Sequence, residues 1–217
     1  LIKDTKVKNL KKKIYTVTKY NNQISIKEAN LFCDWYIKKK LSKNKRKKFS
    51  KEFKKIIKIL THELKLKNNI FVHRDFHVSN LMLVKNQIGV IDSQDALIGN
   101  KAYDLASLID DVRFKTSKSL KQKIYNLYIN KQKKLESSKF KNDFEILSIL
   151  RNLKIIGIFM RLAIRDRKKK YIKLIPYTWK LINNRINGNT LFDDLKKLLN
   201  KYFKKYNNDI KLYKYDH

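Results

Sequence analysis

Residues 71–95 read FVHRDFHVSNLMLVKNQIGVIDSQD, and the rest of the chain is interpreted around them. Three short apolar runs, at 70–72, 81–84 and 88–91, are separated by polar residues. Runs of this length, rich in β-branched residues and bounded by polar turns, predict strands. We therefore expect a small β-hairpin sheet that presents its loops on one side, with a turn at residues 85–87.

The polar loop after the first run has the order H-R-D-x-x-x-x-N, from His73 to Asn80, and Asp92 follows the third run. This order and spacing indicate the catalytic loop of a phosphotransferase. A carboxylate on a rigid loop, here Asp75, can accept the proton of an attacking hydroxyl. The oxygens of Asn80 and Asp92 can hold Mg²⁺ between them.

Other interpretations of the loop stay open. His73 and His77 are four residues apart, which suits a metal pair on a helix, whereas His73 in a loop favours a ring bonded to backbone. Arg74 is either a salt-bridge partner or a phosphate ligand. The simpler alternative is that Asp75, Asn80 and Asp92 are ordinary turn residues.

Two segments carry a family resemblance: HRDFHVSNLM at 73–82 and IGVIDSQDALIGNKAYDLASLIDD at 88–111. They resemble the C-terminal lobe of the aminoglycoside phosphotransferase and choline kinase superfamily. Within it, HRD, the DxQDA segment and the YDLxSLxxD helix are most similar to kinases that phosphorylate the anomeric hydroxyl of N-acetylmuramate and N-acetylglucosamine during cell-wall recycling.

The resemblance implies an α+β fold, a mostly helical kinase-like C-terminal lobe around the small hairpin sheet, with ATP and Mg²⁺ as cofactors and a small-molecule substrate. It makes Asp75 the catalytic base and Asn80 and Asp92 the metal ligands. Asp104 would brace the loop together with His73 and Arg74. A buried carboxylate is costly unless it accepts hydrogen bonds, so we expect Asp104 to accept them from loop amides or from Arg74.

Three more carboxylates are candidates for contacts at the site. Asp95 either contacts metal or substrate, or caps the following turn. The segment 28–41 leads into the lobe beside the acceptor site in the resembling kinases, so Glu28 or Asp34 is a candidate substrate contact.

Composition limits the protein class. The 217 residues suffice for one domain or one large lobe, and 42% hydrophobic content fits a globular chain. No apolar run is long enough to cross a bilayer, and the lone Cys33 cannot form an internal disulfide, so we expect a cytoplasmic protein without a membrane partner.

The charge is strongly positive, with 53 Lys and Arg against 19 Asp and Glu, a net +34. Such a charge alone suggests nucleic acid. Lysine, however, dominates and is spread along the chain, and Asn and Ile are abundant too; these three residues share A/T-rich codons. Nucleic-acid binding is therefore not favoured, because a binding footprint should be clustered and rich in arginine.

The predicted domain organisation places the end of an inter-lobe segment at 1–26, the phosphotransferase C-lobe at 27–206 and a tail at 207–217. The first glycine is Gly89, so no glycine-rich phosphate loop precedes it. We therefore expect the nucleotide lobe to be absent, and the resemblance does not imply that this chain binds ATP by itself.

Apolar spacing of three and four predicts helices outside the hairpin. Ser50 is the expected N-cap of one of them, residues 42–48 (SKNKRKK) are expected to be a basic loop, and Gly99–Asn100 a turn. Pro176 is expected to begin or kink its helix. The expected helices are 27–41, 50–67, 102–112, 119–134, 140–166, 171–186 and 191–205.

Three functions are compared. The first is phosphorylation of an amino sugar, with an aminoglycoside, choline or homoserine as alternative acceptors. The second is an inactive truncated module, favoured by the missing glycine loop. The third is nucleic-acid binding through the charge. The sequence names neither the acceptor nor the oligomeric state.

Overall fold

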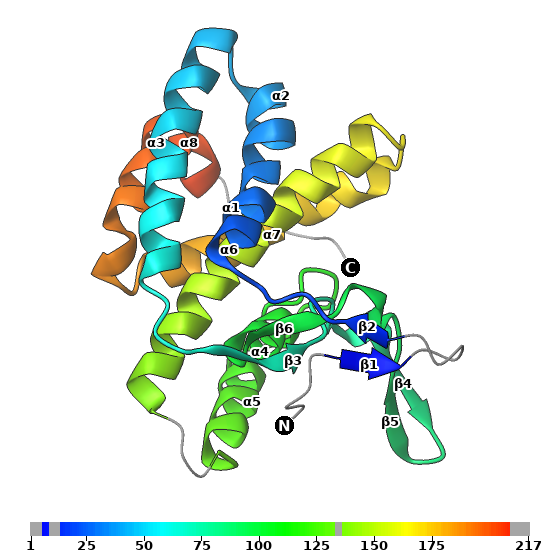
Figure 1. The fold of residues 1–217 in the computed structure, drawn as a ribbon. Helices are drawn as coiled ribbons and strands as arrows, with labels where there is room; N and C mark the ends of the chain where they lie inside the picture. Colours follow the sequence, from blue (N-terminus) through cyan, green and yellow to red (C-terminus); the bar gives the residue numbers. More distant parts are fainter. Residues whose placement is uncertain (1–5, 9–13, 133–135, 209–217) are drawn as a thin grey trace. The chain divides into compact units, whose positions relative to one another are not determined.

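The computed structural model describes residues 6–8, 14–132 and 136–208 (Figure 1). The predicted tail at 207–217 and the first residues of the inter-lobe segment therefore fall largely outside the described residues. The chain divides into two compact units. Unit 1 comprises Leu1–Asn21 and Leu64–Leu147, and unit 2 comprises Asn22–Glu63 and Ser148–His217. Helices dominate the described residues, and small antiparallel sheets accompany them, so the fold is α+β, as predicted.

Unit 1 contains the strands. They form two-stranded antiparallel pairs, β1 with β2, β3 with β6 and β4 with β5 (Figure 1). Their bounds are β1 Lys6–Lys8, β2 Ile14–Thr16, β3 Asn68–Val72, β4 Leu81–Val84, β5 Gln87–Val90 and β6 Leu97–Asn100.

The hairpin predicted after the loop is confirmed. Strands β4 and β5 pair with Leu81 opposite Val90 and Val84 opposite Gln87. The two residues between them, Lys85 and Asn86, have φ of 45° and 62°. Positive φ at both loop positions is the turn whose twist matches a two-residue hairpin, and asparagine tolerates it well.

The prediction of a turn at Gly99–Asn100 is wrong, because both residues belong to strand β6. This strand pairs with β3, and neither of them pairs with the hairpin. All of β6 is buried, because β3 borders it on one side and residues 18–20 on the other. The Tyr20 N–H donates to the Ile98 carbonyl at 2.7 Å. A Cβ at Gly99 would stand 3.0 Å from Val72 Cγ2, so glycine here serves close packing.

The helices of unit 1 are α4 (Ala102–Ile109), α5 (Lys118–Asn130) and the first part of α6 (Ser137–Ile164). Asp143 on α6 is fully buried at 0% exposure and accepts hydrogen bonds from several groups. The backbone N–H groups of Lys65 and Leu66 donate to it at 2.8 Å each, and Asn100 Nδ2 donates at 2.6 Å. This carboxylate ties the segment before β3 and the end of β6 to α6.

Unit 2 is helical. Its elements are α1 (Asn22–Leu31), a π-helical turn (Phe32–Ile37), α2 (Lys38–Lys40), α3 (Lys43–His62), the rest of α6, a 3₁₀ segment (Lys169–Leu174), α7 (Ile175–Ile186), a 3₁₀ turn (Thr190–Phe192) and α8 (Asp193–Asn208). Pro176 lies in the first turn of α7, where its missing N–H costs nothing, so the prediction that it begins the helix is confirmed.

Buried aromatic rings form the core of unit 2. Phe32 stacks on Tyr36 with centroids 5.2 Å apart and meets the edge of Trp179 at 5.7 Å. Phe49 and Phe53 of α3 and Phe203 of α8 complete the cluster. Aromatic contacts of this kind add to the hydrophobic stabilisation of a core.

Gly157 allows α6 to approach the junction between α1 and the π-helical turn. A Cβ there would stand 2.3 Å from the Leu31 carbonyl carbon and oxygen, which are backbone atoms that cannot move aside. This glycine is therefore a packing requirement of unit 2.

Two sequence predictions about the helices are wrong. Residues 43–48 belong to α3, and Ser42, not Ser50, precedes the helix with extended backbone angles. The reason is that Lys and Arg favour helix, while Phe49 extends the buried stripe by one turn beyond Phe53. Ile164 contributes to the apolar spacing that predicts the helix 140–166, but it is 48% exposed at the end of α6.

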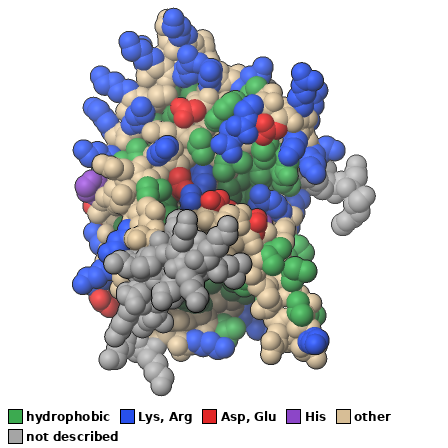
Figure 2. Space-filling model, turned by 45° about the vertical axis from the view of Figure 1, so that its right-hand side comes forward, with side chains coloured by type: hydrophobic (Ala, Val, Ile, Leu, Met, Phe, Trp, Pro, Cys, Tyr) green, Lys and Arg blue, Asp and Glu red, His purple; other side chains and the backbone are tan. Residues whose placement is uncertain are grey.

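The described part of the chain has no helix that is both long and apolar enough to cross a membrane. Lys and Arg side chains are spread over the face shown in Figure 2 rather than gathered in one place.

Cys33 is the one cysteine of the chain and is buried in the π-helical turn. Burial raises the pKa of its thiol to about 12, although a hydrogen bond with Ser50 acts in the opposite direction. At pH 8, which lies far below a pKa of about 12, only about one thiol in ten thousand is a thiolate. We expect a thiol-specific disulfide reagent to leave the folded protein unlabelled and to label one thiol after unfolding. Rapid full labelling of the native protein would contradict the burial of Cys33.

Candidate active site

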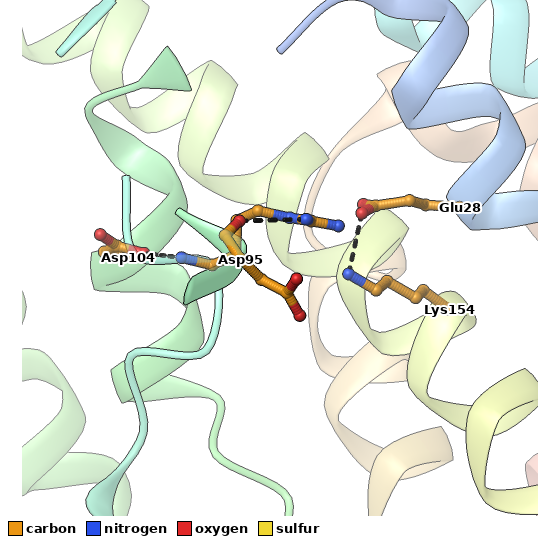
Figure 3. A network of polar contacts seen from close by, with 5 residues as sticks. Glu28, Asp95, Asp104 and Lys154 are labelled. Atoms are coloured by element: carbon orange, nitrogen blue, oxygen red, sulfur yellow. Dashed lines mark hydrogen bonds and ion pairs between the residues drawn. The ribbon is translucent and has the colours of Figure 1, made fainter. Parts of the chain in front are cut away.

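The start of the loop is held by the carboxylate of Asp104 on α4. The His73 N–H donates to Asp104 Oδ2 at 2.7 Å. The Arg74 N–H donates to Oδ1 at 3.0 Å, and Figure 3 shows Asp104 with this bond. Arg74 has φ of 71°, which is costly for a residue with a side chain. Two hydrogen bonds to an ionised carboxylate offset that cost. These contacts are the ones that the sequence led us to expect of Asp104; its part in catalysis stays a prediction.

The loop closes on the backbone carbonyl of Asp75. The His77 N–H donates to this carbonyl at 3.0 Å, and the Asn80 side-chain Nδ2 donates to it at 2.9 Å. Both bonds hold the loop without using the Asp75 carboxylate. The second bond uses the amide nitrogen of Asn80 as donor, and the amide oxygen is the atom of this side chain that can bind a hard cation.

The end of β5 is tied to the same loop. The Ile91 N–H donates to the Asn80 carbonyl at 3.1 Å, and His73 Nε2 lies 2.9 Å from the Ile91 carbonyl. A carbonyl only accepts, so this contact assigns the proton of a neutral His73 ring to Nε2. Asp92 is the next residue, and its backbone is therefore anchored to the loop that carries Asp75.

Asp92 and Asp95 are both exposed and lie at the two ends of the short turn that follows β5. Asp92 has φ of 71°, and its Oδ1 accepts a bond from Gln94 Nε2 at 3.0 Å. Arg74 Nη1 donates to the backbone carbonyl of Asp95 at 3.1 Å (Figure 3). This bond fixes the backbone of Asp95, while the role of its carboxylate stays open.

Glu28 and Asp34 belong to unit 2. Glu28 Oε1 lies 3.0 Å from Lys154 Nζ, and both side chains are largely buried (Figure 3). Sequence reasoning missed this lysine. Asp34 is exposed in the π-helical turn. Substrate contact by either residue stays a prediction.

The sequence alone assigns no role to Tyr128 or Asp111, although Asp111 is the last residue of the YDLxSLxxD segment. Burial raises the pKa of Tyr128, and the negative charge of Asp104 adds to this effect. Asp111, just beyond α4, accepts a hydrogen bond from the Val78 N–H at 3.1 Å. No local spacing signals this contact, because α4 ends at Ile109 and Asp111 lies outside the helix.

The oxygen donors of Asn80 and Asp92 fit Mg²⁺, a hard cation that proteins bind through one or two side chains while substrate phosphates and water supply the rest. Within residues 6–8, 14–132 and 136–208, no cluster of three His, Cys, Asp or Glu side chains could hold a metal. Asn80 and Asp92 supply one amide and one carboxylate, so a metal held by them would need its remaining ligands from phosphate oxygens and water.

Comparison with known proteins identifies the family. A model described as "Phosphotransferase enzyme family" matches residues 24–133, which contain the whole loop. The chain is 34% identical over 72% of its length to the N-acetylmuramate/N-acetylglucosamine kinase of Neisseria meningitidis, covering 49% of that protein. It is 29% identical over 83% of its length to the kinase of the same name from Pseudomonas aeruginosa, covering 55% of it.

A third kinase of that name, from Caulobacter vibrioides, is 32% identical over 51% of this chain and 32% of its own length. The chain thus spans at most about half the length of these curated relatives. The family match covers the loop, its anchoring helix and the strand end with Asp92. The chain therefore belongs to the phosphotransferase enzyme family.

Proposed function

We propose that the protein transfers a phosphoryl group from ATP to a hydroxyl of an amino sugar, N-acetylmuramate or N-acetylglucosamine. The observation that carries the proposal is the hydrogen bonding of the loop on both sides of Asp75. The Arg74 N–H before it donates to Asp104, and the Asn80 side chain after it donates to the Asp75 carbonyl. The names of the three relatives support the choice of an amino sugar as acceptor.

In this mechanism Asp75 orients the acceptor hydroxyl and takes its proton, which requires a carboxylate at a fixed position. Asn80 and Asp92 would hold Mg²⁺, which neutralises charge on the transferred phosphoryl group. Asp104 keeps the loop in place through the His73 and Arg74 amides. The protein's own contribution is therefore chiefly positioning.

The proposal assigns residues 27–206 to a kinase-like C-terminal lobe, with the catalytic loop at 73–80 and the metal segment at 92–95. It places the enzyme in the cytoplasm, in cell-wall recycling, with a small molecule as its partner. These assignments rest on the resemblance of the motifs and on the family membership.

The test measures acceptor-dependent ADP release by the product of the complete reading frame that contains this chain. N-acetylglucosamine, N-acetylmuramate, kanamycin, choline and homoserine are compared at equal concentration with MgATP. We expect the two amino sugars to be turned over fastest. Faster turnover of kanamycin, choline or homoserine would change the acceptor class. No turnover of any acceptor, with no shift in melting temperature on adding MgATP, would favour an inactive module.

A further inference from the structure

Two carboxylates at opposite ends of α4 contact the loop at different points. Asp104, in the first turn, accepts the amides of His73 and Arg74. Asp111, beyond the last turn, accepts the Val78 N–H through Oδ2 at 3.1 Å and the Arg113 N–H through Oδ1 at 2.9 Å. Asp111 is 1% exposed, so its charge is balanced by these bonds rather than by water.

The hydrogen bond to Asp111 is made by the first amide of the turn that carries Asn80. Val78 begins the 3₁₀ turn Val78–Asn80, and the first amides of a helical turn have no partner within it. Asp111 supplies the missing acceptor from outside the loop. Because the turn is only three residues long, fixing its first amide also fixes Asn80 at its end.

We propose that Asp111 is a positioning residue for phosphoryl transfer, holding the metal-binding end of the loop while Asp104 holds its start. This inference rests on the proposed function. One short helix thereby sets the spacing between Asp75 and Asn80. Asp111 acts through the backbone and touches neither metal nor substrate.

The adjacent Asp110 provides a matched control. It is 2% exposed and occupies the C-terminal end of the same helix, but it forms an ion pair with Lys121 of α5 at 3.1 Å. Asp110→Asn and Asp111→Asn therefore make the same chemical change at neighbouring buried positions. In Asp111→Asn one side-chain oxygen becomes an N–H donor. If the remaining oxygen keeps the Arg113 amide, the new donor faces the Val78 N–H.

The experiment measures turnover against Mg²⁺ concentration in the complete protein, and amide hydrogen exchange at Val78. For Asp111→Asn we expect the Mg²⁺ concentration for half-maximal turnover to rise about 10–100-fold, as for other residues that orient a metal ligand. Exchange at Val78 should be about tenfold faster. The KM for the acceptor should stay within about twofold, and Asp110→Asn should leave the Mg²⁺ requirement unchanged.

Should Asp111→Asn fail to fold, Val78→Pro removes the donor instead. Proline is compatible with the first position of a helical turn, and His77 before it is extended, as a residue preceding proline prefers. The same rise in Mg²⁺ requirement is expected.

Three results overturn the inference. If the wild-type protein is active and neither Asp111→Asn nor Val78→Pro changes its Mg²⁺ requirement, the inference is wrong while the proposed function stands. Equal rises in Asp110→Asn and Asp111→Asn reduce Asp111 to a structural residue. A wild-type protein without transfer to any acceptor overturns the proposed function together with the inference.

Discussion

Replacing Asp75 with asparagine should lower the turnover number of the complete protein by about 10²–10⁴-fold, the usual contribution of a general base. The loop should stay in place, because the bonds from His77 and Asn80 end on the Asp75 backbone carbonyl, which the substitution keeps. The melting temperature should therefore change little, and the acceptor KM should stay close to that of the wild type. Steady-state kinetics with MgATP and N-acetylglucosamine measure the effect.

A matched control is Asp194→Asn on α8, an exposed carboxylate 3.8 Å from Lys197. Exposed pairs of this kind contribute little to stability, so this variant should behave as the wild type. If Asp75→Asn also turns over at the wild-type rate, Asp75 is not the base. If it melts far below the wild type, the loop depends on the carboxylate and the contacts described above are incomplete.

Replacing Asp143 with alanine should lower the free energy of unfolding by about 3 kcal/mol or more. The substitution leaves the Lys65 and Leu66 N–H groups, whose bonds to Asp143 are partly buried, and the buried Asn100 side chain without their acceptor. The loss of a buried acceptor costs about 1–3 kcal/mol. Asn100 Oδ1 in turn accepts the Ala102 N–H at 3.0 Å, at the start of α4. The damage should therefore reach the helix that anchors the loop. Urea denaturation followed by circular dichroism measures the change.

Two further variants make the test of Asp143 discriminating. Asn142→Ala removes one donor, Asn142 Nδ2 at 3.0 Å from Asp143 Oδ1, and should cost about 1 kcal/mol or less because the other donors remain. Asp143→Asn keeps one acceptor oxygen and should fall between the two. Equal stability of Asp143→Ala and the wild type would refute the role of this carboxylate as a structural tie.

The hairpin could be predicted because its signals are local. Alternating short runs and an asparagine in the turn specify β4 and β5 without any distant contact. Strand β6 could not be predicted in the same way. Its four residues become a strand through β3 and through residues 18–20, and Gly99 reads as a turn until the packing against Val72 is known.

The candidate site shows the same division. The motif predicts roles for Asp75, Asn80 and Asp92 because their spacing is fixed within one segment, and these roles stay predictions. The hydrogen bonds of Asp104 could be predicted from the cost of burying a carboxylate, although the side chain is only half-buried in the structure. The hydrogen bond from the Val78 N–H to Asp111 joins residues 33 positions apart, and no local sequence pattern predicts a contact over that separation.

The start of α3 was missed for a different reason. Residues 43–48 have almost no apolar side chain, so their helix is invisible to hydrophobic periodicity. The propensity of Lys and Arg, and continuity with Phe49, decide it instead. Charge runs that precede a buried stripe are therefore better read as possible first turns than as loops.

The most direct measurement of the central claim is a ³¹P NMR spectrum of the product made by the complete protein from MgATP and N-acetylglucosamine. We expect a new phosphate resonance coupled to the anomeric proton of the sugar, because the resemblance in sequence implies transfer to the anomeric hydroxyl, and we expect it to grow at least about 100-fold more slowly with Asp75→Asn. A resonance coupled instead to the C6 protons would contradict the acceptor position. A spectrum showing only ATP after prolonged incubation, with N-acetylmuramate giving the same result, would contradict phosphoryl transfer to an amino sugar altogether.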